Sequence, residues 1–93
     1  MRIIGYIPHT AYKVTVFKDG GRISVKFENG MYEQTYKFRD GSGVENLAEA
    51  TAFVDADFLS EIEKIFTLMH VGKLQAYQRR QTAEDEDEFD VII

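Results

Sequence analysis

The stretch RISVKFENGMYEQTYKF, residues 22–38, decides the fold of this chain. Apolar side chains alternate with polar ones on both sides of Asn29-Gly30, which is the pattern of two half-buried β-strands. Asn-Gly favours a two-residue hairpin turn, because the type I′ geometry needs positive φ at both positions. Such a turn predicts the pairs Phe27 with Tyr32, Val25 with Gln34, Ile23 with Tyr36, Lys26 with Glu33 and Ser24 with Thr35. The apolar residues then share one face and the charged pair has opposite signs, so an antiparallel hairpin is predicted.

The segment before this hairpin predicts a second one. Apolar residues stand at alternate positions here too: Tyr12, Val14 and Val16. Turn residues follow at Asp19-Gly20-Gly21. A two-residue loop at Asp19-Gly20 would pair Val16 with Ile23. One at Gly20-Gly21 would pair Val16 with Val25, and both loops keep the apolar face together.

Residues 3–7 also indicate a strand, which runs into Pro8. Proline cannot donate a hydrogen bond to a neighbouring strand, so it belongs at a sheet edge, a bulge or a break. We expect one long first strand on a sheet edge, kinked near Pro8-His9-Thr10, rather than two separate short strands.

Two helices are predicted after the loop at residues 40–43. Ser42 and Glu45 have the spacing of a capping box, which indicates a short helix start. Asp55 is the expected N-cap of a longer helix. Its apolar residues recur at three- and four-residue steps and should cover the apolar face of the sheet: Phe58, Leu59, Ile62, Ile65, Phe66 and Met69. Gly72 is the natural stop; beyond it, either the helix continues with a shifted face or a second helix begins at Lys73.

These elements predict an α+β fold: a three- to four-stranded antiparallel hairpin meander with one face covered by a C-terminal helix or helices. We expect a single domain over residues 1–83. Residues 84–93 should form an acidic tail with an apolar C-terminal end, without regular structure. The expected core is Val14, Val16, Ile23, Val25, Phe27, Tyr36, Phe38, Phe58, Ile62, Ile65, Phe66 and Met69.

Composition limits the environment and the partners. The 93 residues include no cysteine, which excludes disulfides and thiolate metal sites. No apolar run is long enough to span a membrane and no secretory signal is recognisable, so a cytoplasmic location is expected. Residues 1–40 carry seven Lys and Arg against four acids, whereas residues 41–93 carry four against twelve. This asymmetry favours contact between the two halves, within one chain or between two.

Groupings that support catalysis are absent from the sequence. His9 and His70 lie far apart and no motif surrounds either. Asp55, Asp57 and Glu61 have the spacing that helix capping requires. The loop at residues 41–43 lacks the lysine and the spacing of a P-loop. We therefore predict a non-enzymatic protein with no catalytic residue, cofactor or metal.

Protein–protein interaction is the function that the sequence favours. Val71, Leu74 and Tyr77 form an apolar stripe out of phase with the main helix face, and the core is small. We expect a homodimer that uses this stripe or an open sheet edge. In the tail, Phe89, Val91 and Ile93 would point one way in an extended chain, so residues 89–93 are predicted to dock as a short strand on a sheet edge.

Nucleic-acid binding is the alternative function. The outward sheet face combines basic groups with an aromatic side chain, which suits single-stranded nucleic acid: Lys13, Phe17, Arg22, Lys26, Lys37 and Arg39. The net charge of −5 opposes a polyanion, so a protein, either a second copy or another chain, is the favoured partner.

Overall fold

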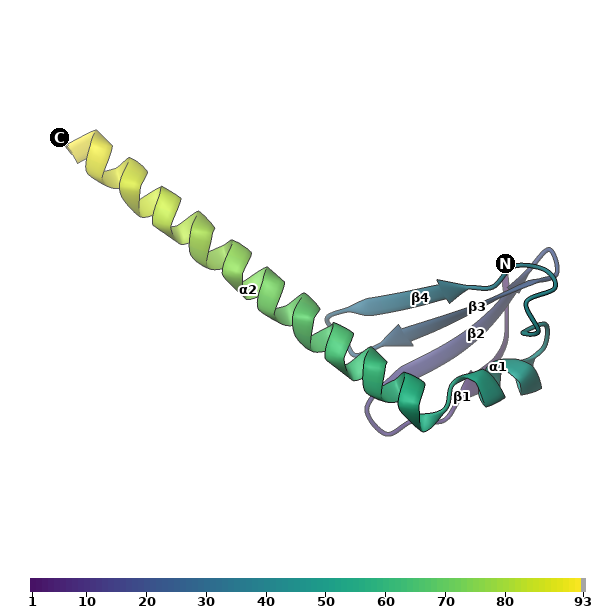
Figure 1. Ribbon diagram of the computed structural model, residues 1–93. Helices are drawn as coiled ribbons and strands as arrows, with labels where there is room; N and C mark the ends of the chain where they lie inside the picture. The colour runs from purple at the N-terminus through teal and green to yellow at the C-terminus, as the bar shows by residue number, and fades with distance from the viewer. Residues whose placement is uncertain (93) are drawn as a thin grey trace. The chain divides into compact units, whose positions relative to one another are not determined.

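The computed structural model describes residues 1–92, with side chains for residues 1–82. Its elements are β1 (Arg2–Ile7), β2 (Lys13–Asp19), β3 (Arg22–Glu28), β4 (Glu33–Lys37), α1 (Leu47–Phe53) and α2 (Ala56–Ile92) (Figure 1). The predicted α+β fold, an antiparallel sheet followed by a C-terminal helix, is confirmed. The chain divides into two compact units, residues 1–62 and the part of α2 that follows Ile62. The predicted domain boundary between residues 83 and 84 stays a prediction.

The four strands lie in the order β1-β2-β3-β4, each antiparallel to the next (Figure 1). The predicted two-residue loop between β2 and β3 is confirmed and falls at Gly20-Gly21, so that Val16 faces Val25. Both glycines have positive φ, 57° and 89°, which a type I′ turn requires and which other residues rarely adopt.

The expected long first strand is wrong, because the chain forms two strands, β1 and β2, that pair with each other. The turn between them depends on His9, whose Nδ1 accepts hydrogen bonds from the backbone N–H of Ala11 (3.0 Å) and Tyr12 (3.2 Å). The His9 ring also stacks on the Tyr12 ring, with centroids 4.7 Å apart. A local side-chain cap therefore converts the break at Pro8 into a reversal of the chain.

The predicted register between β3 and β4 is also wrong, by two positions. Tyr36 faces Val25 rather than Ile23, and Gln34 faces Phe27 rather than Val25. A type I′ turn at Asn29-Gly30 would need positive φ at Asn29, whereas only Gly30 adopts it, with φ 95°.

Asn29 instead caps a four-residue loop, residues 29–32. Its side-chain Oδ1 accepts from the N–H of Met31 (3.2 Å) and of Tyr32 (2.9 Å). Its own N–H donates to the Tyr32 carbonyl (3.2 Å). Because the shift is two positions, every side chain keeps its predicted face of the sheet.

The core lies between the inward face of the sheet and the first turns of α2. Rings of Phe27, Tyr36 and Phe58 meet edge to face, with centroids 5.2 to 5.9 Å apart. Gln34 is buried among them and fully bonded: its Nε2 donates to the Ile62 carbonyl (3.0 Å) and its Oε1 accepts from the Tyr36 hydroxyl (2.6 Å). The buried members of the predicted core are Val14, Val16, Ile23, Val25, Phe27, Ile62 and Phe66.

Four other members of the predicted core are half-buried: Tyr36, Phe38, Phe58 and Met69. Ile65 is the exception, with an exposed fraction of 38%. Ile65 was placed in the core because it continues the three-residue spacing from Ile62, and that spacing drifts around a helix of 3.6 residues per turn.

Helix α1 begins later than predicted, at Leu47. Gly43 has φ 88°, which a right-handed helix does not allow, so the capping box at Ser42 cannot form. Asn46 is the N-cap instead, and its Oδ1 accepts from the N–H of Glu49 (2.8 Å). Leu47 packs over Gly5 of β1, where an added Cβ would lie 2.6 Å from a Leu47 methyl carbon.

Helix α2 begins where predicted, because Asp55 Oδ1 accepts from the N–H of Phe58 (2.8 Å). It does not end at Gly72 but continues to Ile92, so the absence of regular structure after Thr82 was predicted wrongly. A glycine inside a helix costs only about 1 kcal/mol relative to alanine, and the flanking residues include good helix formers. None of the described helices is apolar enough over a sufficient length to cross a membrane.

Candidate functional site

Exposed apolar side chains recur along α2 at every third position. Their exposed fractions are 38% for Ile65, 69% for Leu68, 42% for Val71, 47% for Leu74 and 54% for Tyr77. The predicted partner-binding residues, Val71, Leu74 and Tyr77, thus all lie on one helix and are all exposed. We call these three the α2 stripe. Three residues fall about 60° short of a full turn of an α-helix, so successive residues of the stripe are displaced by about 60° around the helix axis. The three side chains therefore span an arc of about 120°.

An arc of this width matches the apolar face with which an ordinary surface helix packs on its neighbour. The remaining side chains of residues 67–82 are polar or small, apart from the exposed Leu68 and the half-buried Met69. The stripe therefore has the composition and width of a helix-packing surface.

The other predicted partner-binding residues are in the C-terminal segment. Phe89 and Val91 fall within α2, so their backbone is helical rather than extended as predicted. Their side chains, and Ile93 as a whole, lie outside the described residues. The docking role of residues 89–93 stays a prediction.

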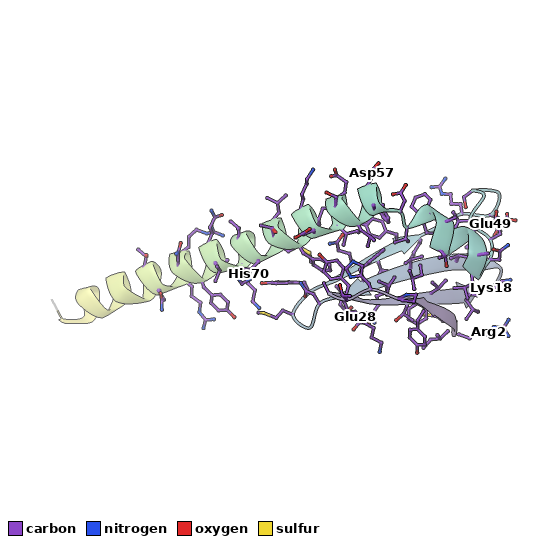
Figure 2. All side chains as sticks on the ribbon, turned by 90° about the horizontal axis from the view of Figure 1, so that it is seen from below. Arg2, Lys18, Glu28, Glu49, Asp57 and His70 are labelled. Atoms are coloured by element: carbon purple, nitrogen blue, oxygen red, sulfur yellow. The ribbon has the colours of Figure 1, made fainter. Side chains whose placement is uncertain are left out.

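The outward face of the sheet brings together most of the predicted nucleic-acid-binding residues. The antiparallel register places Lys13 beside Glu28 and Lys26 beside Thr35. Phe17 lies beside Ser24 of β3, and Ser24 lies beside Lys37 of β4. Arg22 lies at the β2–β3 turn, and Arg39 follows β4 outside the strands. In Figure 2, Arg2 and Lys18 mark one end of the sheet and Glu28 the opposite end.

Tyr6 belongs to this face and was missed. The β1–β2 register sets Tyr6 beside Thr15, and its exposed fraction is 56%. Tyr6 could be assigned to this face only if the chain were known to reverse after Pro8, because that reversal pairs β1 with β2 and so fixes the residue opposite Tyr6. With Tyr6 in place, the face holds two aromatic rings, and Lys13 Nζ lies 6.0 Å from the centre of the Tyr6 ring.

Carboxylates partly neutralise the charge of the outward face. Lys26 Nζ lies 3.4 Å from Glu28 Oε1 and 3.9 Å from Glu33 Oε1, and also 5.9 Å from the centre of the Phe17 ring. The predicted attraction between Lys26 and Glu33 is therefore present, although they face each other diagonally rather than directly. These contacts reduce the positive field available to a phosphate backbone.

The remaining candidates for chemistry are few. Among the described side chains, no three His, Asp or Glu residues gather as metal ligands. A shallow hollow of about 280 Å³ lies at the end of the sheet, lined by Met1, Arg2, Lys18, Asp19, Gly20 and Gly21. Its charges are already engaged in part, since the N-terminal ammonium lies 3.6 Å from Asp19 Oδ1.

Burial raises the pKa of the Tyr36 hydroxyl. This hydroxyl donates to Gln34 in the core, so its pKa shift reflects packing rather than an active site. Comparison with known proteins gives no match to any family model, curated protein or solved structure.

Proposed function

We propose that this protein is a non-enzymatic protein-interaction module that self-associates, with the α2 stripe as a contact surface. The observation that carries the proposal is the exposure of Val71, Leu74 and Tyr77 on a single arc of one helix. We also propose a cytoplasmic location, in keeping with the cysteine-free composition.

Helix energetics support the proposal. An isolated helix in water is marginal, because propagation gains little per residue and most helical stability in proteins comes from packing an apolar face. In the unit that follows Ile62, nearly every side chain from Thr67 to Thr82 is exposed. A second chain that covers the α2 stripe would supply the missing packing, at about 1.5–3 kcal/mol for each large apolar side chain that becomes fully buried.

Charge favours an antiparallel arrangement of two such helices. Residues 84–88 are five consecutive acids, and Lys73, Arg79 and Arg80 precede them in the same helix. Parallel helices would set the two acidic runs side by side, whereas antiparallel helices bring each acidic run toward the basic segment of the other chain. In this proposal residues 84–93 form the acidic and apolar docking segment.

Sedimentation equilibrium over a concentration series tests the proposal. Leu74→Glu adds a charge in the middle of the α2 stripe. Ala76→Glu is the matched control, because it adds the same charge about 160° away around the helix. We expect the parent chain and the control to self-associate at about 100 μM, and Leu74→Glu to have a lower average mass at the same concentration. A contact that is half-formed at that concentration has a free energy of about −5.5 kcal/mol. A monomeric parent chain at this concentration would refute self-association.

Single-stranded nucleic acid binding by the outward sheet face is the second candidate function. The specific observation in its favour is the pair of aromatic rings, Tyr6 and Phe17, each with a lysine nearby. Fluorescence anisotropy with a labelled oligonucleotide at two salt concentrations tests it. Binding that weakens steeply with salt and is lost in Tyr6→Ala supports this function; binding at neither salt concentration excludes it.

A further inference from the structure

The β4 strand presents an unpaired edge with a defined set of backbone groups. The N–H of Phe38, just beyond β4, donates to the Ile23 carbonyl (2.9 Å), so residue 38 directs its backbone toward β3. Successive residues of a strand direct their N–H and C=O groups to opposite sides. Glu33, Thr35 and Lys37 therefore point theirs away from β3, and all three residues are exposed.

The opposite edge of the sheet differs in each respect that matters for pairing. A bulge interrupts β1 between Ile3 and Gly5, and Pro8 follows its end. Leu47 of α1 also packs over Gly5. Bulges, proline and a covering helix are the devices that prevent a sheet edge from pairing. β4 has neither a bulge nor a proline over its five residues, and the contacts with α2 described above are made by Gln34 and Tyr36 on its inward face.

We propose that two copies of this chain pair through their β4 strands, antiparallel and about a two-fold axis at Thr35. In this register Thr35 faces Thr35 of the second copy. Glu33 faces Lys37 of the second copy at both ends of the contact. Each facing pair exchanges two backbone hydrogen bonds, so the outward groups of Glu33, Thr35 and Lys37 are all satisfied. The interface is isologous, and the two sheets become one continuous sheet.

The charges on β4 select this register. Charged residues on an edge strand usually prevent pairing, because equal charges meet across the new contact. A two-fold axis at Glu33 would set Glu33 against its own copy, and an axis at Lys37 would set two lysines together. Only the axis at Thr35 places opposite charges at both ends while using the whole strand. The strand is thus complementary to itself.

This inference goes beyond the proposed function, because the β4 edge and the α2 stripe are different surfaces and carry separate tests. The chain has no cysteine, so single-cysteine variants report on one position each. Facing residues of a hydrogen-bonded antiparallel pair have Cα atoms about 5.5 Å apart, which is within the range that a disulfide bridges. Thr35→Cys should therefore form a disulfide-linked dimer under mild oxidation in dilute solution.

Lys37→Cys is the matched control from the same strand. In the proposed register the two copies of residue 37 are about 14 Å apart, too far for a disulfide. Lys37→Cys alone should stay monomeric on a non-reducing gel, whereas a mixture of Lys37→Cys and Glu33→Cys should give a mixed dimer. If Thr35→Cys forms no more dimer than Lys37→Cys, the β4 interface is refuted.

Charge reversal in the Thr35→Cys background tests the ion pairs. Glu33→Lys and Lys37→Glu each create equal charges at both ends and should slow cross-linking about tenfold. The double variant restores opposite charges and should restore the rate. A double variant as slow as the single ones would overturn the register.

Leu74→Glu in the same background separates the two proposals. Cross-linking that persists in Leu74→Glu supports the β4 interface whatever the fate of the α2 stripe. If sedimentation shows a dimer that depends on Leu74 and Thr35→Cys does not cross-link, the proposed function stands and the β4 interface falls.

Discussion

Ile62→Ala should strongly destabilise the sheet unit. Ile62 has an exposed fraction of 0% and lies where α2 meets the inward face of the sheet. The substitution deletes three carbon atoms, and about 0.8 kcal/mol for each gives a transfer contribution of about 2.4 kcal/mol. The cavity left between Ile62 and the rigid sheet adds to this, so the free energy of unfolding should fall by about 3–4 kcal/mol.

Urea denaturation followed by near-ultraviolet circular dichroism measures this loss, because that signal arises from the packed rings of Phe27, Tyr36 and Phe58. The midpoint should move to lower urea with an unchanged slope. Leu68→Ala is the matched control: Leu68 is 69% exposed, and its truncation should change the free energy by less than about 0.5 kcal/mol. A loss below about 0.5 kcal/mol for Ile62→Ala would mean that α2 does not cover the sheet as described.

Three further changes probe α2 and the core. Gly72→Ala should stabilise α2 by about 1 kcal/mol, because an added Cβ meets nothing within 4 Å; amide exchange around residue 72 should slow. Asp55→Ala should cost about 1 kcal/mol in thermal denaturation, because the N–H of Phe58 loses its capping acceptor, whereas Asp55→Asn should retain most of the stability. Burial raises the pKa of Tyr36 above its ordinary value of 10.0, so its hydroxyl ionises at a lower pH in the unfolded chain than in the folded one. The stability that Tyr36 contributes is complete below pH 10 and lost as pH rises through the folded pKa; in Tyr36→Phe the alkaline loss should be smaller.

Period-two patterning and local turn chemistry were sufficient for the strands, the faces of the sheet and the fold class. Alternation assigns each side chain of residues 13–37 to a face, and those assignments survive in the structure. The two-residue length of the loop between β2 and β3 and the N-cap at Asp55 were predictable, because turn residues and an N-cap act on their immediate neighbours, whereas the structure decided that the loop is Gly20-Gly21. The predicted pairing with Val25 put Gln34 on the apolar face, and Gln34 is buried on that face, where its Oε1 accepts a hydrogen bond from the Tyr36 hydroxyl.

The candidate surfaces were predictable only in part. The α2 stripe is visible in the sequence as apolar residues at three-residue steps, and its exposure follows from the drift of that spacing around the helix. Tyr6 could not be found, since its place beside Thr15 depends on the reversal of the chain at His9. The charge complementarity of Glu33 and Lys37 also required the structure, which shows that β4 is an edge strand.

The sequence by itself determined that residues 13–37 form strands, which face each of those strands turns inward, and where α2 begins. Only the tertiary structure decided the register of β4, the pairing of β1 with β2 and the continuation of α2 beyond Gly72. The physical reason is that a shift of two positions leaves every side chain on the same face, so the apolar pattern cannot choose between the two registers. The choice falls partly to the local cap at Asn29 and partly to the bond from Gln34 to the Ile62 carbonyl, which forms only when the chain is folded.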